Sequence, residues 1–161
     1  MKYAKVQEEE LKNKVALDFF GGYDCTEVIE KIDFAVKAHG VRLIDSYFLW
    51  AEAKAAQTDI CEMLTQLVLT VGKARTFDKI APPPFLGCFD REKIAFIPYH
   101  AVQEIFYQSD FNWKVTPSKR DTTEFRQVHS LIKSILFEES ADGSRQSADT
   151  YIFDFEKNEK E

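Results

Sequence analysis

The 161-residue sequence has little cysteine and no long hydrophobic run, and these absences exclude several classes of protein. Cys25, Cys61 and Cys88 lie far apart and form no C-x-x-C pair, so neither a disulfide framework nor a zinc ribbon is predicted. The three histidines, His129 among them, are equally dispersed, and we interpret them as surface or core residues. No stretch approaches the roughly 20 apolar residues that span a membrane, and residues 1–10 lack the apolar core of a signal peptide. We therefore expect a soluble, cytoplasmic protein with no membrane partner.

The sequence also lacks an excess of positive charge, because 21 Lys and Arg stand against 27 Asp and Glu, a net charge of −6. A protein that coats nucleic acid by bulk positive potential needs clustered Lys and Arg, so that class is excluded. The acidity is concentrated in residues 138–161, with 8 acids and 3 bases, whereas residues 1–137 carry 19 acids and 18 bases. An acidic pocket within a mildly basic surface remains compatible with this distribution.

What the chain does contain is enough apolar side chain for one folded core, since 45% of residues are hydrophobic and 14 are Phe. Apolar spacing predicts helices over residues 2–20, 60–71 and 122–135, and a shorter helix over residues 101–107. Asp59 and Asp121 are the predicted caps of the two later helices, and Gly72 is the predicted stop of the second. Strand-like runs cover residues 32–36, 41–53, 85–89, 93–98, 113–115 and 151–153.

This order of elements predicts an α/β or α+β fold with a small central mixed sheet flanked by helices. We assign residues 1–138 to the folded domain. Residues 139–161 are interpreted as a polar loop, an edge strand and the start of a connector to a further domain.

The strongest functional signal lies at the end of the second predicted strand, in Glu52 and Lys54. Because side chains alternate along a strand, these two residues are expected to share a face with Phe48 and Trp50. The neighbouring strand supplies Asp33, another acid among apolar residues. Two carboxylates offer the oxygen ligands that Mg²⁺ prefers, and a lysine can orient water or stabilise charge on a phosphate. The combination favours metal-assisted phosphodiester hydrolysis, although the spacing alone fits a structural ion pair equally well.

Other residues bear on the same prediction. A helical plot places Glu8 inside the apolar stripe of the first helix, where a buried carboxylate is unfavourable unless it is paired or binds a ligand. Glu10 and Lys12 repeat the Glu-x-Lys spacing, but there a charged helix surface explains it. Asp45 is an alternative to Asp33 as the first metal ligand, depending on where the hairpin turns. Asp33 is preferred because it lies within an apolar, strand-like run.

These segments resemble the PD-(D/E)XK nuclease core, and more narrowly the N-terminal nuclease domain of type IIG restriction-modification enzymes. The resemblance covers roughly residues 5–136 and includes the helix with Gln66 and Leu67. It implies Asp33 and Glu52 as metal ligands for Mg²⁺, Lys54 as the catalytic lysine, Glu8 as a further metal ligand and Gln66 as a supporting residue. The proline of the family name is absent, since Ile32 precedes Asp33.

The resemblance implies double-stranded DNA as substrate, with cleavage by a dimer. It also implies downstream target-recognition and methyltransferase domains in the parent chain, the latter using S-adenosylmethionine. Candidate DNA contacts are Lys73, Arg75, Lys119 and Arg120, each of which is also explained as a solvated loop charge. Two alternatives stay open: a catalytically silent DNA-binding or assembly module on the same fold, and a repair or junction nuclease.

Overall fold

The computed structural model describes residues 3, 6–25, 29, 31–38, 47–140, 143–146 and 150–155. The α-helices are α1 (Glu8–Phe20), α2 (Ile60–Ala74), α3 (Thr76–Lys79) and α4 (Thr123–Leu136), and 3₁₀ turns cover Tyr99–Ala101 and Gln103–Tyr107. The strands are β1 (Tyr23–Asp24), β2 (Phe34–Ala38), β3 (Tyr47–Ala53), β4 (Phe85–Phe89), β5 (Lys93–Pro98), β6 (Phe137–Ser140), β7 (Gly143–Gln146) and β8 (Tyr151–Asp154).

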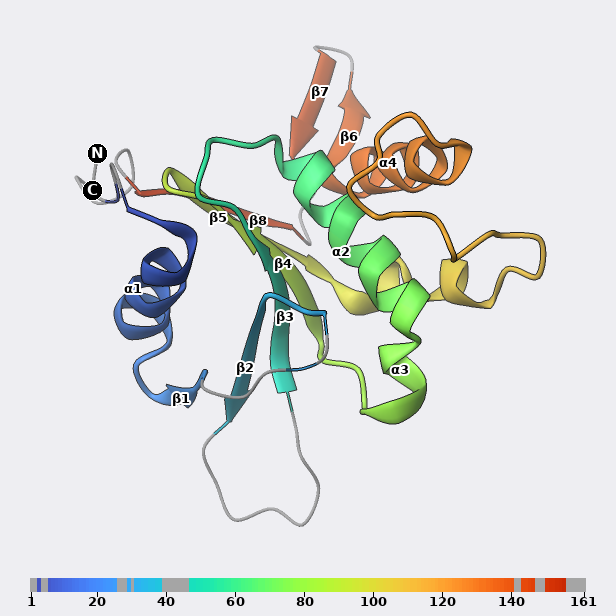
Figure 1. Cartoon of the computed structure of the whole chain (residues 1–161). Coiled ribbons are helices and arrows are strands. Elements are labelled where there is room, and N and C mark those ends of the chain that lie inside the picture. The colour runs from blue at the N-terminus through green and yellow to red at the C-terminus, as the bar shows by residue number, and fades with distance from the viewer. Residues whose placement is uncertain are drawn as a thin grey trace.

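Within the described residues, the main sheet has six strands in the order β1-β2-β3-β4-β5-β8, so the expected mixed sheet flanked by helices is confirmed (Figure 1). β3 and β4 are parallel and are joined through α2 and α3, whereas the other neighbouring pairs are antiparallel. β6 and β7 form a separate hairpin after α4. A parallel pair needs a long crossover, and the amphipathic helix α2 supplies it.

The two faces of the sheet carry different cores, with α1 on one side and α2 and α4 on the other (Figure 1). On the α1 side, Leu11 and Val15 pack with Leu49, Ala51 and other buried residues. The larger core on the α2 side holds Trp50, Leu67 and the apolar stripe of α4. The sheet is therefore covered on both faces at its centre, where β3 and β4 lie.

A β-bulge in β3 corrects one prediction about side-chain direction. Val36 pairs with Leu49 but Lys37 pairs with Tyr47, which leaves Phe48 as an extra residue in β3. Trp50 consequently packs in the α2-side core while Phe48 packs on the α1 side, where its ring lies 5.8 Å from that of Tyr23. The expectation that Phe48 shares the face of Trp50 was wrong, because the bulge interrupts the alternation.

Several helix ends differ from the sequence prediction. α2 continues through Gly72 to Ala74 and ends at Arg75, which takes a left-handed conformation with φ 51°. α4 is capped by Thr122, whose hydroxyl accepts a hydrogen bond from the Phe125 amide at 3.1 Å; Asp121 is not the cap. Asp59 caps α2 as predicted, accepting from the Glu62 amide at 3.1 Å.

Other segments also depart from the prediction or extend it. Residues 76–79 form α3 inside the predicted loop, and residues 113–115 form turns where a strand was expected. The predicted strands at 85–89 and 93–98 are confirmed, as is the edge strand near 151–153. Because β8 pairs with β5, residues 151–154 are part of the main sheet. Among the described residues, no helix combines the length and apolar character needed to cross a membrane.

Candidate functional site

Asp33, Glu52 and Lys54 lie together at one end of the central strands. Asp33 immediately precedes β2, and the antiparallel register that pairs Phe34 with Ala51 brings it opposite Glu52. Its carboxylate accepts a hydrogen bond from the Ala53 amide at 3.2 Å. Lys54 Nζ lies 3.2 Å from Glu52 Oε1. The structure thus brings together the three residues that the sequence singled out, and Asp45 lies outside the described residues.

Glu52 is buried, which is unusual for a carboxyl group, and is only 7% exposed. Burial, assisted by the negative charge of Asp33 and a hydrogen bond to it, raises the pKa of Glu52 to about 7. The ammonium of Lys54 opposes this rise without cancelling it. Near neutral pH Glu52 is therefore about half protonated, as expected for a carboxyl group buried beside another acid.

Lys12 of α1 is a further charged residue close to these acids, and the sequence analysis misjudged it. Its side chain is 17% exposed, so it does not belong to a charged helix surface. Burial lowers its pKa, but the hydrogen bond to Glu9 and the charge of Asp33 outweigh burial, and the net pKa is raised. Lys12 is thus a second cation beside Asp33. The period of the helix could have identified it, since Leu11 and Val15 on either side are fully buried.

Glu8 does not have the buried position that the helical plot predicts. Its side chain is 40% exposed, and its carboxylate lies 3.8 Å from Lys12 Nζ. Among the described residues, Glu8, Asp33 and Glu52 do not form a group whose donor atoms all lie within 4.8 Å of one another. Gln66, in contrast, is 6% exposed within α2, which packs on β3 and β4. Its supporting role stays a prediction.

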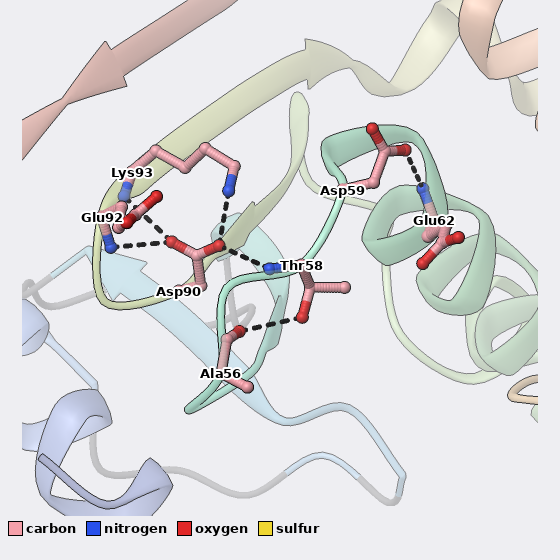
Figure 2. A network of polar contacts seen from close by, with 7 residues as sticks. All are labelled: Ala56, Thr58, Asp59, Glu62, Asp90, Glu92 and Lys93. Carbon is pink, nitrogen blue, oxygen red and sulfur yellow. Dashed lines mark hydrogen bonds and ion pairs between the residues drawn. The ribbon is translucent and has the colours of Figure 1, made fainter. Parts of the chain in front are cut away.

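Asp90 is a structural residue of the site that the sequence pattern did not single out. It is fully buried at the end of β4 and accepts hydrogen bonds from the amides of Thr58, Glu92 and Lys93 at 2.8–3.1 Å (Figure 2). Lys93 Nζ adds an ion pair at 2.5 Å. Because Thr58 lies between β3 and α2, Asp90 fastens the segment that follows Lys54 to the β4–β5 turn. Figure 2 also shows the Asp59 cap one residue further on.

The four predicted DNA contacts lie in different surroundings. Arg75 is paired with Asp78 at 2.6 Å, and Arg120 with Glu62 at 3.1 Å. Lys119 is exposed in the loop before α4. Lys73 lines a hollow of about 690 Å³ whose other lining residues are Lys31, Thr70, Ala74, Thr116 and Pro117. Lys31 lies two residues before Asp33, so one lining residue of this hollow is close in the sequence to an acid of the site.

A second group of chemically active side chains lies where α2 meets α4. Donor atoms of Asp59, Cys61 and His129 lie within 4.8 Å of one another, with His129 Nε2 4.0 Å from Asp59 Oδ2. The interpretation of the cysteines and histidines as dispersed residues missed this group. Asp59 and Cys61 are neighbours in the sequence, but only the packing of α2 against α4 brings His129 to them.

The cysteines are not activated as nucleophiles. Burial, assisted by nearby carboxylates, raises the pKa of the Cys25 and Cys61 thiols to about 11. Burial also raises the pKa of Cys88, which is fully buried. Thiolate chemistry at neutral pH therefore has no support in the free chain.

No family model, no curated protein and no solved structure matches the chain.

Proposed function

We propose that the chain is a Mg²⁺-dependent endonuclease domain that hydrolyses phosphodiester bonds in double-stranded DNA. The observation that carries the proposal is the meeting of Asp33, Glu52 and Lys54 at the ends of two paired strands. Two acids and a lysine are the groups that metal-assisted phosphodiester hydrolysis uses. Their placement on rigid strands favours a fixed geometry over a fluctuating one.

The acids fit a divalent ion because they are in contact and one of them is buried. Burial and the charge of Asp33 raise the pKa of Glu52, which means that the ionised form of Glu52 is unfavourable in the free chain. A bound dication would stabilise that ionised form. Mg²⁺ prefers carboxylate oxygens and keeps several water molecules, so two carboxylate ligands from the protein suit it. Bound by Asp33 and Glu52, the ion would neutralise phosphate charge and lower the pKa of its water.

The chain's own cations would contribute charge stabilisation. Lys54 Nζ lies 3.2 Å from Glu52 Oε1 and the side chain is 32% exposed, so its ammonium contacts both Glu52 and solvent. In this position it can donate hydrogen bonds to a phosphate oxygen as negative charge develops. Lys12 adds a second positive charge near Asp33.

The DNA path is proposed to follow the basic hollow. Lys31 and Lys73 line it, and Lys119 is exposed in the loop that follows Pro117. Arg75 and Arg120 already pair with acids of the chain, so they are weaker candidates for phosphate contact. Phosphate contacts of this kind position DNA without reading its sequence.

The test combines cleavage with metal binding. Supercoiled plasmid is incubated with the chain and Mg²⁺ or Mn²⁺, and nicking is followed on gels. We expect Glu52→Gln and Lys54→Met to reduce cleavage about 100-fold or more, the scale of loss for transition-state stabilising groups. Titration calorimetry with Mn²⁺ should give binding that Glu52→Gln abolishes and Lys54→Met retains.

Glu10→Gln is the matched control, since Glu10 has the same Glu-x-Lys spacing but pairs with Lys14 on an exposed helix surface. It should cut DNA as the wild type does. Cleavage by Glu52→Gln at the wild-type rate would show that the Glu52–Lys54 pair is only structural. Wild-type protein that neither cuts DNA nor binds Mn²⁺ would support the silent module on the same fold.

A further inference from the structure

We propose that Asp59, Cys61 and His129 form a second metal site, specific for a transition-metal dication of the Zn²⁺ class, which ties the start of α2 to α4. All three donor atoms already lie within 4.8 Å of one another in the metal-free chain. In tetrahedral Zn²⁺ sites, bond lengths of about 2.0–2.3 Å imply donor separations of about 3.3–3.7 Å. The gap of 4.0 Å between His129 Nε2 and Asp59 Oδ2 therefore has to close by about 0.7 Å, and each distance to Cys61 Sγ by at most about 1.3 Å.

The donor set selects the type of metal. A thiol sulfur and an imidazole nitrogen are ligands for Zn²⁺ and its neighbours, whereas Mg²⁺ and Ca²⁺ prefer oxygen alone. This separates the group from the carboxylates of Asp33 and Glu52, which suit a hard cation. The inference does not rest on the proposed nuclease activity.

Neighbouring residues hold each donor in place. The Asp59 carboxylate is fixed at the start of α2 because it caps the helix through the Glu62 amide. The His129 ring stacks on Phe125 one turn earlier in α4, with ring centroids 6.0 Å apart and planes 25° apart. Cys61 is 6% exposed in the first turn of α2. Ligands whose orientation is already set lose less entropy on binding, and such supporting contacts strengthen metal sites.

Solvent reaches the group from one side, because the side chains of Asp59 and His129 are 60% and 34% exposed. Three protein ligands leave the fourth position of a tetrahedral ion to water. The nearby Glu62 carboxylate is held at 3.1 Å by Arg120. The site thus has an entry path and an open coordination position.

The experiment uses the metal alone. The chain is freed of metal with a chelator and then titrated with Zn²⁺ in a calorimeter and with Co²⁺ in a spectrophotometer. We expect one ion per chain, the visible bands of tetrahedral Co²⁺, and a thiolate-to-cobalt charge-transfer band. Zn²⁺ should also raise the Tm by several degrees, because α2 and α4 become linked.

Three variants test the ligands. Asp59→Asn keeps the helix cap but loses the anionic ligand, so affinity should fall at least tenfold with the fold intact. His129→Gln should bind at least tenfold more weakly, and Cys61→Ser should lose the charge-transfer band. Cys25→Ser is a control that should bind Zn²⁺ as the wild type does. Glu52→Gln should keep the thiolate-to-cobalt charge-transfer band, which separates this site from the carboxylate pair.

The proposal is overturned if the wild type binds no Zn²⁺ or Co²⁺, or if Asp59→Asn and His129→Gln bind as tightly as the wild type. Loss of binding in Glu52→Gln instead of His129→Gln would place the ion at the carboxylate pair. Failure of DNA cleavage alone leaves all of these readouts unchanged, so the two proposals fail separately.

Discussion

At the scale of single residues, Glu52 is the most consequential side chain because its burial has a cost in the free chain. Its pKa of about 7 lies above the ordinary value near 4.5. Between these values the folded chain holds a proton that the unfolded chain has released. Stability therefore falls as pH rises from about 4.5 to 7, and the full penalty, on the order of 2–3 kcal/mol, applies above pH 7.

Glu52→Gln tests this directly. The variant should be about 1–3 kcal/mol more stable than the wild type at pH 8 without metal, because an amide cannot ionise. The difference should shrink towards zero near pH 4.5. Urea unfolding at several pH values measures it, with the exposed Glu10→Gln as a control that changes stability by less than about 0.5 kcal/mol. A stability difference that grows on acidification would contradict the assignment.

At the scale of elements, the sequence predicts α2 well but misplaces its end. Glycine often ends a helix, but Gly72 lies inside α2. The Trp113 ring packs against it and leaves no room for a side chain. A Cβ on Gly72 would lie 2.1 Å from the Trp113 ring, so the glycine is required by a close approach and not by backbone conformation. Trp113 is far away in sequence and local pattern cannot report it.

Gly72→Ala should therefore destabilise the chain by about 1–2 kcal/mol, since the clash with Trp113 exceeds the gain of about 1 kcal/mol in helix propensity. In a Trp113→Ala background the same substitution should become neutral or stabilising. Thermal or urea unfolding of the four proteins gives the coupling as a double-mutant cycle. Additive effects of the two substitutions would rule out this contact as the reason for the glycine.

The candidate site was predictable to the extent that its residues are marked by local pattern. Asp33, Glu52 and Lys54 could be found because each is a charge at the edge of an apolar strand, and antiparallel pairing brings neighbouring strands together. The prediction for Glu8 was wrong because a helical plot assumes that the apolar stripe faces the core along the whole helix. In the first turn of α1 the stripe does not face the core, and Glu8 is 40% exposed. No sequence motif near Cys61 or His129 indicates that the two residues meet in the fold.

At the scale of the whole molecule, the C-terminal part described in the structure completes the fold. β8 extends the sheet beside β5, and Phe155 after it is fully buried. The Phe155 ring lies 5.0 Å from that of Tyr3 and 5.3 Å from that of Phe19. The α1-side core is thus closed by residues from both ends of the described chain.

Phe155→Ala should cost about 3–5 kcal/mol of unfolding free energy, as expected for removing a buried aromatic ring. Tyr151→Ala, in the same strand but 46% exposed, should cost much less. Chemical denaturation of both variants measures the comparison. An equal loss of unfolding free energy in the two variants would mean that the Phe155 ring is not part of the core.

The β-bulge at Phe48 also sets where β3 can change length. Deleting Phe48 would restore regular alternation and leave Leu49, Trp50 and Ala51 in their present pairing with β2. Deleting Ala51, which lies between Trp50 and Glu52, would instead turn Glu52 and Lys54 towards the apolar core on the α1 side. The bulge thus divides one strand into a segment where insertions and deletions are absorbed and a segment whose residue count is fixed by the site it carries.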